Sequence, residues 1–461
     1  LFILRMARKE KDSLGEVEVP ENVYYGSFTQ RAKDNFKLSG IKEHPALIKA
    51  YILVKKAAAN ANIKLKSLDS ERGNAIIEAC DEILDGNYQD QFVLDMFQAG
   101  AGTPFNMNSN EVIANLASEK LGKEKGSYYV HPNDHVNMGQ SSNNVTPTAV
   151  KVASLLLLKD LISELELLSK EFRKKGKEYG DLVKVGRTHL MDAVPITYGQ
   201  VFNSYASSIN HSAKRLERNS GGLLEIGLGG NAIGTGINTD DKFREIAASE
   251  LSKITDFEFK EASDNIEMTW TMAPFVEFSS SIKNLALELD KISSDLRLLS
   301  SGPKAGLNEI TLPEVEPGSS IMPGKINPSI AEAVNQVCLQ VVGNCSVIDE
   351  ASRSGQLELN FYTPLIGFNL IWSLELLTRT VKMFNEKCIA GLEVNEERVK
   401  ELFDKSVCQA TALCPELGYS KVAELVKEAW KKDKSMKELV LEKDLLEEEK
   451  VEELFKAENL T

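Results

Sequence analysis

Residues 146–180, TPTAVKVASLLLLKDLISELELLSKEFRKKGKEYG, form the stretch of sequence that decides the fold. Apolar side chains recur at i, i+3, i+4 and i+7, and no Pro or Gly lies between Pro147 and Gly176. This period is that of an amphipathic helix, and at 1.5 Å per residue it predicts a helix roughly 40 Å long. Further long helical stretches are predicted at 197–218, 266–300, 329–352 and 363–390.

These five stretches predict a mainly α fold with a long central helical bundle. Helices that are apolar over wide faces bury those faces against other helices, including helices of other chains, so we expect an oligomer. The chain before the bundle mixes turn signals with short amphipathic runs and predicts no long helix. The charge runs after about Asn395 are typical of solvated helix faces. We expect a mainly helical N-terminal domain at 1–137, the bundle at 138–394 and a small helical C-terminal domain at 395–461.

The composition excludes several classes of protein. The 461 residues include 54 Lys and Arg against 68 Asp and Glu, which gives a formal net charge of −14. Such an acidic chain repels phosphate backbones and anionic lipid, so we expect no nucleic-acid partner and no membrane partner. A small anionic substrate would need a local cationic pocket. No run approaches the roughly 18 apolar residues of a membrane-spanning helix.

The six cysteines show no CxxC pair and no histidine spaced to complete a zinc site. Reduced thiols of this kind are typical of a cytoplasmic protein, and we expect neither a metal nor a cofactor. The opening LFIL is too short for the apolar region of a secretory signal. Because Met6 begins a polar stretch, we expect Leu1 to Arg5 to be an upstream extension.

Four polar, Gly-rich clusters interrupt the helical pattern: AGAGTPFNMNSNEVIAN (99–115), HPNDHVNMGQSSNNVTPTA (131–149), GRTHLMDAVP (186–195) and PGSSIMPGKINPSIAEA (317–333). Each cluster alone is explained by helix caps and turns, which favour Ser, Thr, Asn and Gly. Four of them in one helical chain favour a functional role. His131 and His135 lack a third metal ligand, and Pro132 argues against a helix there. We interpret both histidines as structural or second-site residues.

The fourth cluster is the most informative. Successive backbone amides at Gly318, Ser319 and Ser320 can form a concave anion site. Lys325 adds a compact positive charge and Asn327 adds a further donor. The segment therefore offers fixed donors for a carboxylate, together with hydroxyls that could serve as a base.

GSSIMPGKINP (318–328) is similar to the signature loop of the fumarase/aspartase superfamily, GSSxMPxKxNP, and the other three clusters resemble its remaining motif regions in the same order. The resemblance covers nearly the whole chain. It implies a three-part chain whose central helices assemble into a tetrameric twenty-helix core, with each active site built from loops of three subunits. It also implies reversible trans-elimination to fumarate through an aci-carboxylate intermediate.

The resemblance assigns roles by motif position. Ser319 is the base that removes the proton, and Lys325 helps to stabilise its alkoxide. The carboxylate that becomes the aci-acid is held by Thr103, Ser141, Ser142 and Ser320. The other carboxylate is held by Thr188, Lys325 and Asn327. Asn143 and His189 lie near the leaving group, and Glu332 is the acid that pairs with this histidine.

Three segments are more similar to the aspartase branch than to the fumarase branch: DSLGEVEVP (12–20), NQVCLQVVGN (335–344) and SGQLELNFYTPLIG (354–367). We therefore expect elimination of ammonia from L-aspartate. The alternative is interconversion of L-malate and fumarate, and an alternative of another class is a non-catalytic helical scaffold. The sequence departs from the family pattern at Pro104-Phe105, at Gly139 where Ser is common, and at Asn144 in place of the usual Asp. These departures leave the substrate open between the two acids.

Overall fold

The structure is a computed structural model that describes residues 7–456 and 460. The expected extension, Leu1 to Arg5, lies outside the described residues. The chain divides into two compact units. Unit 1 comprises Leu1–Leu161, Arg215–Asn284 and Gln340–Leu376, and unit 2 comprises Ile162–Lys214, Leu285–Leu339 and Leu377–Thr461. The division into three domains at 137/138 and 394/395 stays a prediction.

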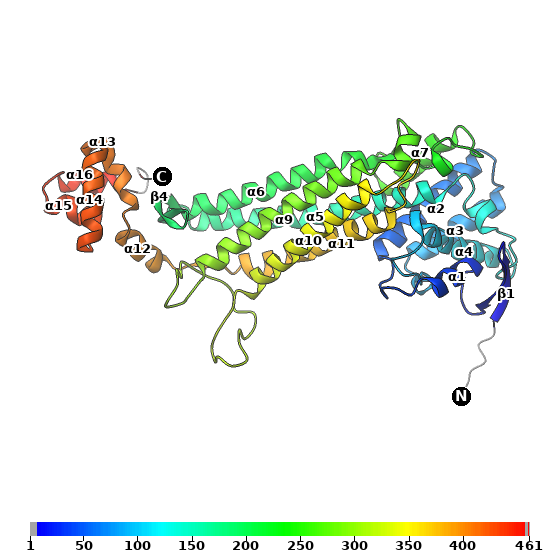
Figure 1. The fold of residues 1–461 in the computed structure, drawn as a ribbon, viewed down its shortest axis with the longest axis horizontal. Helices are drawn as coiled ribbons and strands as arrows, with labels where there is room; N and C mark the ends of the chain where they lie inside the picture. Colours follow the sequence, from blue (N-terminus) through cyan, green and yellow to red (C-terminus); the bar gives the residue numbers. More distant parts are fainter. Residues whose placement is uncertain (1–6, 457–459, 461) are drawn as a thin grey trace. The chain divides into compact units, whose positions relative to one another are not determined.

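The predicted mainly α fold is confirmed. Five long helices contribute residues to both units: α5 (Ser142–Glu178), α6 (Tyr198–Asn219), α9 (Ala273–Leu299), α10 (Ser329–Arg353) and α11 (Thr363–Phe384) (Figure 1). No helix among residues 7–456 combines the length and the apolar character that crossing a bilayer requires.

Two predicted helix boundaries were wrong. The stretch 266–300 is split into α8 (Asn265–Trp270) and α9. Pro274 lacks an amide, and its ring would clash with the carbonyl of Trp270 in a continuous helix. Thr271 is extended instead, and its hydroxyl accepts a hydrogen bond from the amide of Ala273 at 3.2 Å. Helix α11 ends at Phe384 and continues only as a π-helical turn, Asn385–Ile389.

The prediction that no long helix precedes the bundle was also wrong. Unit 1 contains α2 (Pro45–Lys64) and α4 (Thr103–Lys120), which have 20 and 18 residues. Most residues of α2 are buried, on every side of the helix. Because buried residues lie all round the helix, its sequence lacks the one-sided period that identifies a surface helix.

Unit 1 surrounds these two helices with shorter elements. Its remaining helices are α1 (Ser27–Asn35), α3 (Ser70–Leu84), α7 (Phe243–Thr255) and α8. The antiparallel hairpin of β1 (Ala7–Asp12) and β2 (Gly15–Pro20) pairs Ala7 with Pro20, and β5 (Glu225–Ile226) runs parallel to β6 (Lys260–Glu261). The long helices touch closely: a Cβ on Gly367 of α11 would lie 2.6 Å from Val150 of α5, which explains the glycine.

Unit 2 holds the other segments of the long helices. Phe172 of α5 is fully buried, and its ring lies 6.4 Å from that of Phe202 on α6 and 6.5 Å from that of Phe384 on α11. Ser293 of α9 donates to the carbonyl of Ala331 on α10 at 2.7 Å. The antiparallel hairpin of β3 (Val183–Thr188) and β4 (Met191–Thr197) leads directly into α6. Strand β7 (Ile310–Thr311) pairs with β8 (Glu393–Val394).

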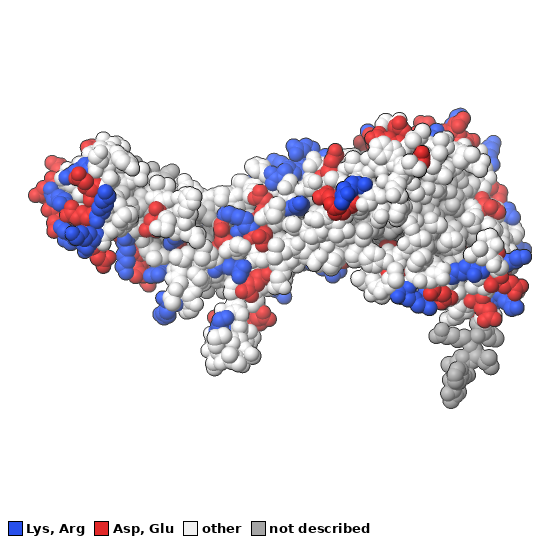
Figure 2. Space-filling model, in the orientation of Figure 1, with Lys and Arg blue, Asp and Glu red and all other residues white. Residues whose placement is uncertain are grey.

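The end of the chain, also in unit 2, begins with α12 (Glu396–Lys405), which packs against β3. The helices that follow surround an apolar cluster of their own: α13 (Cys414–Leu417), α14 (Tyr419–Lys432), α15 (Met436–Glu442) and α16 (Glu448–Leu454). Leu413, Leu425, Met436 and Leu439 are buried in the cluster. Figure 2 shows Lys, Arg, Asp and Glu side chains mixed over the outer surface of this region, as expected of solvated helix faces.

Candidate active site

Two helix N-termini lie side by side in unit 1. Thr103 is the first residue of α4, and α5 begins at Ser142, four residues before the predicted start of its helix. Gly102 has a φ of +70°, and a Cβ there would lie 2.7 Å from Oγ1 of Thr146. That hydroxyl donates to the carbonyl of Ala101 at 2.6 Å, which joins the first turn of α5 to the start of α4. The N-terminus of a helix is the positive end of its dipole and favours negative charge, so this junction suits a carboxylate.

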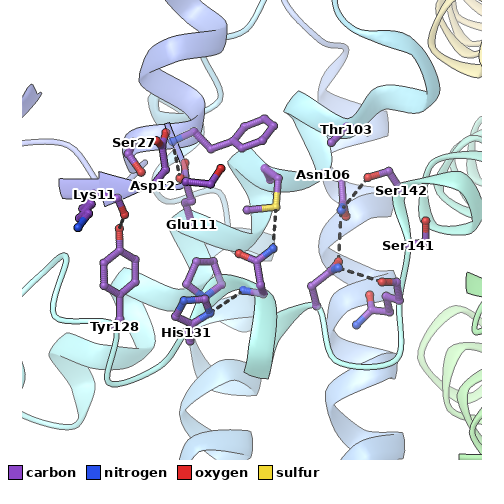
Figure 3. A pocket seen from close by; sticks show the side chains of 17 residues that line it. Lys11, Asp12, Ser27, Thr103, Asn106, Glu111, Tyr128, His131, Ser141 and Ser142 are labelled. Atoms are coloured by element: carbon purple, nitrogen blue, oxygen red, sulfur yellow. Dashed lines mark hydrogen bonds between the residues drawn. The ribbon is translucent and has the colours of Figure 1, made fainter. Parts of the chain in front are cut away.

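A cavity of about 750 Å³ opens at this junction. Three of the predicted carboxylate-binding residues, Thr103, Ser141 and Ser142, line it together (Figure 3). The fourth site residue of unit 1, Asn143, is not among the lining residues, and its Nδ2 donates to the carbonyl of Ala232 at 2.7 Å. Ala232 belongs to a Gly-rich loop whose role the sequence analysis missed, although its sequence GLGGNAIGTG (227–236) is a visible signal.

A buried polar network supports Ser142 and was also missed. Asn106 donates from Nδ2 to Oγ of Ser142 and to Oδ1 of Asn137, both at 3.2 Å. The fully buried Nζ of Lys55 donates to Oδ1 of Asn137 at 2.9 Å and to Oε1 of Gln140 at 3.0 Å. Burial holds the pKa of Lys55 well below its usual value. The available signal was a lysine in the middle of the apolar run YILVKKAAA.

Two of the three departures from the family pattern, at Pro104-Phe105 and Gly139, have local explanations, and nothing in the structure explains Asn144. Gly139 has a φ of +70°, which glycine adopts without strain, in the turn before Ser141. Pro104 lies in the first turn of α4, where its missing amide costs nothing. Phe105 is buried, with its ring 4.9 Å from that of Tyr51. Asn144 is 2% exposed, and its Oδ1 has no hydrogen-bond partner within the described chain.

The two histidines of the second cluster bind backbone groups. Nδ1 of His131 accepts from the amides of Asn133 and Asp134 at 3.2 Å each, and Nδ1 of His135 accepts from the amide of His131 at 2.8 Å. These bonds favour the structural interpretation. Pro132 begins one π-helical turn, Pro132–Val136, so the expectation of no helix there was wrong. No group of three His, Cys, Asp or Glu residues that could hold a metal occurs in the part of the chain that the structure describes.

In unit 2, Thr188 and His189 lie at the tip of the β3–β4 hairpin. His189 and Leu190 have φ values of +56° and +63°, as a two-residue hairpin turn requires. Both site residues are exposed in the single chain. Thr188 lines a second cavity, of about 640 Å³, together with Lys184 and Arg187. Asp295 and several apolar side chains line this cavity as well.

The loop that carries Ser319 is closed at its base. The amide of Gly318 donates to the carbonyl of Lys325 at 2.8 Å, and Nδ2 of Asn327 donates to the carbonyl of Gly318 at 2.7 Å. A Cβ at Gly318 would lie 2.6 Å from the oxygen of Lys325, so only glycine fits. Nζ of Lys325 donates to Oδ1 of Asn327. The closure brings Ser319, Lys325 and Asn327 onto one short loop.

Two amides point at the oxygen of the proposed base. Oγ of Ser319 accepts from the amide of Ile321 at 3.2 Å and from that of Met322 at 3.0 Å. Hydrogen bonds to the charged form of a group favour that form, so these amides lower the cost of a Ser319 alkoxide. The tip of this loop is apolar and open, with Ile321 84% and Met322 48% exposed. In Figure 2 most of the loop's surface is uncharged.

The predicted pair of His189 and Glu332 is not formed within one chain. Glu332 lies in the first turn of α10, with Oε1 3.9 Å from Nη2 of Arg297. Among the described residues, no hydrogen bond or ion pair joins it to His189. Ser320 is exposed on the same loop as Ser319.

Each unit thus holds part of the expected site: unit 1 has the N-termini of α4 and α5, and unit 2 has the β3–β4 hairpin and the Ser319 loop. Residues 15–343 match the family model described as lyase, and residues 410–461 match the model described as the C-terminus of fumarase C. The chain belongs to this lyase family, which confirms the resemblance to the fumarase/aspartase superfamily.

Within this lyase family, the chain is similar over nearly its whole length to several aspartate ammonia-lyases. The chain is 45% identical to the aspartate ammonia-lyase of Bacillus sp over 455 residues, which cover 98% of this chain and 97% of the relative. It is 46% identical to the aspartate ammonia-lyase of Pseudomonas aeruginosa over 458 residues, with 98% and 97% covered.

Solved structures agree with the fold. The chain matches a fumarate lyase:delta crystallin from Brucella melitensis, crystallised with cobalt bound, with a TM-score of 0.95, 46% identity and 99% of each chain covered. It matches a class II fumarase from Schistosoma mansoni with a TM-score of 0.94, 36% identity and 98% of each chain covered.

Lys55 and its neighbour Lys56 allow a matched test of the buried network. Replacing Lys55 with Met should lower kcat/KM by about tenfold or more, because Asn137 and Gln140 lose the donor that fixes the turn before Ser142. Lys56 is only partly buried and pairs with Asp81, so Lys56→Met should change kcat/KM by less than about twofold. Steady-state kinetics of both variants check this, and equal effects of the two would contradict the role of the network.

Proposed function

We propose that the protein catalyses the reversible elimination of ammonia from L-aspartate to give fumarate. Relatives named aspartate ammonia-lyase, 43–46% identical over 98% of this chain, support this reaction. The observation that carries the chemistry is the Ser319 oxygen, which accepts from two amides on a loop that also presents Lys325 and Asn327. Hydration of fumarate is the second candidate, supported by the 36% identical class II fumarase.

The reaction begins with removal of a proton from carbon 3 of aspartate. The proton moves to Oγ of Ser319, and the C–H electrons pass into the neighbouring carboxylate, which becomes an aci-carboxylate with a second negative charge. This carboxylate is held by Thr103, Ser141, Ser142 and Ser320. The positive ends of the α4 and α5 dipoles stabilise its added negative charge. The electrons then return to form the double bond as the C–N bond breaks and ammonia leaves.

The other residues hold the rest of the substrate. Thr188, Lys325 and Asn327 bind the carboxylate that does not change. Asn143 and His189 contact the leaving amine, and Glu332 orients the histidine. Neither a metal nor an organic cofactor has a role in these steps.

We further propose a homotetramer whose active sites each draw loops from three subunits. The open apolar residues support this assembly, because large exposed apolar side chains mark surfaces that another chain covers. Such residues lie on the long helices and on the site loops: Leu167, Leu190, Leu287, Ile321 and Leu339. The absence of a His189–Glu332 pair within one described chain fits a pair formed between chains.

Five of six cysteines are buried and all are free, which supports a cytoplasmic location.

Incubation with fumarate tests the substrate. With ammonium present, purified protein should form L-aspartate, because the amine adds back across the double bond. With fumarate alone it should form little L-malate. Chromatography of the products checks both, and rapid malate formation without aspartate would replace this proposal with fumarate hydration.

Replacing Ser319 with Ala should abolish turnover, because the hydroxyl acts in the transition state and does not hold the fold. Binding of a non-reactive dicarboxylate and the oligomeric state should survive. Ser346→Ala is the matched control, since Ser346 lies exposed on α10 and its hydroxyl donates only to the carbonyl of Val342. Turnover by Ser319→Ala within about tenfold of the wild type would reject the base assignment.

Mixing inactive variants tests the shared site. Co-refolded Thr188→Ala and Ser319→Ala chains should regain part of the wild-type activity, because some sites then take every functional loop from an intact copy. Each variant refolded alone is the control. A mixture that forms mixed tetramers and stays inactive would refute the shared arrangement.

A further inference from the structure

A buried carboxylate joins the two groups of site residues in unit 2. Glu309 is 1% exposed and directly precedes β7. Its Oε1 lies 2.6 Å from Nη1 of Arg187. Its Oε2 lies 3.1 Å from Nζ of Lys184 and accepts from the hydroxyl of Tyr198 at 2.9 Å. None of the roles assigned above belongs to Glu309.

The three partners hold the β3–β4 hairpin from both ends. Lys184 and Arg187 lie on β3, and Arg187 immediately precedes Thr188. Tyr198 begins α6 directly after β4. The two site residues, Thr188 and His189, lie at the tip of the hairpin, next to Arg187. A displaced Arg187 would therefore displace Thr188.

The backbone of Glu309 is fixed as well, at the stem of the loop that carries Ser319. Its amide donates to the carbonyl of Leu299, and its carbonyl accepts from the amide of Asn395, both at 2.9 Å. Hydrogen bonds thus tie it to the end of α9 and to the residue after β8. The chain then runs through β7 into the Ser319 loop.

The cluster contains two basic side chains and one carboxylate. Burial lowers the pKa of Lys184, and Glu309 opposes that effect. Without the carboxylate, Lys184 and Arg187 would be buried without this counter-charge, and both would move toward water. Since Lys184 and Arg187 also line the cavity beside Thr188, this movement would change the carboxylate-binding wall.

We propose that Glu309 is a positioning residue for the elimination reaction. Its carboxylate holds Arg187 and Lys184, and so fixes the hairpin tip with Thr188 and His189 relative to the stem of the Ser319 loop. This inference rests on the proposed function for its kinetic test, whereas its structural test is independent of the substrate.

Glu309→Gln keeps the size of the side chain and an acceptor for Tyr198 but loses the charge. We expect KM for L-aspartate to rise about fivefold or more and kcat/KM to fall about tenfold or more. The deuterium isotope effect with L-aspartate labelled at carbon 3 should increase, because a displaced Thr188 holds the substrate carboxylate wrongly, moves carbon 3 away from the base and makes proton removal slower than the later steps. A merely structural role would reduce the folded fraction, which lowers Vmax but leaves KM and the isotope effect unchanged.

Glu428→Gln is the control, since Glu428 of α14 also pairs with two cations, Lys432 and Lys443, at 2.8 and 3.0 Å. It should leave KM and the isotope effect at wild-type values. If Glu309→Gln does not fold, Tyr198→Phe removes one donor to the same carboxylate and should raise KM about twofold. If the folded variant, Glu309→Gln or otherwise Tyr198→Phe, has the same KM and the same isotope effect as the wild type, the inference is overturned.

Amide hydrogen exchange separates this inference from the proposed function. In Glu309→Gln, amides of residues 183–197 should exchange faster than in the wild type and in Glu428→Gln, whichever acid the enzyme accepts. Unchanged protection of the hairpin would overturn the positioning role. A wild-type protein that fails to deaminate L-aspartate, together with a loosened hairpin in Glu309→Gln, would reject only the substrate.

Discussion

The N-terminus of an α-helix is the positive end of its dipole, and the proposed carboxylate site depends on that property. Thr103 and Ser142 begin α4 and α5, so both lie at such positive ends. The Ser319 loop leads directly into α10, and Glu332 lies in the first turn of that helix. The interiors of the long helices are buried and apolar, so their ends are where the chain can present polar groups to a substrate.

A second constraint keeps those ends in place, since a buried polar or charged group must have hydrogen-bond partners. In unit 1 the buried amine of Lys55 donates to Asn137 and Gln140, and so fixes the turn before Ser141 and Ser142. In unit 2 the carboxylate of Glu309 has the same effect on the Thr188 hairpin. Removing either group would leave its partners buried without a counterpart.

Much of the fold could be predicted because the long helices are amphipathic, and their period is visible in the sequence. Helix α2 could not be predicted, because its buried residues lie on every side of the helix. The break before α9 depends on one residue, Pro274, because its ring would clash with the carbonyl of Trp270 in a continuous helix. The candidate site residues were found through short, dense motifs. Lys55 and Glu309 were missed because their partners lie far away in the sequence, and only the fold brings such groups together.

The local electrostatics explain how an acidic chain can bind a substrate with two carboxylates. The formal net charge is −14, yet charges in physiological salt are screened beyond about 8 Å. At that range the local groups decide: the N-termini of α4 and α5 in unit 1, and Lys325, Lys184 and Arg187 in unit 2. All of these lie beside residues proposed to bind carboxylates. These positive groups favour a carboxylate where the substrate's own charge is bound and where it increases during the reaction.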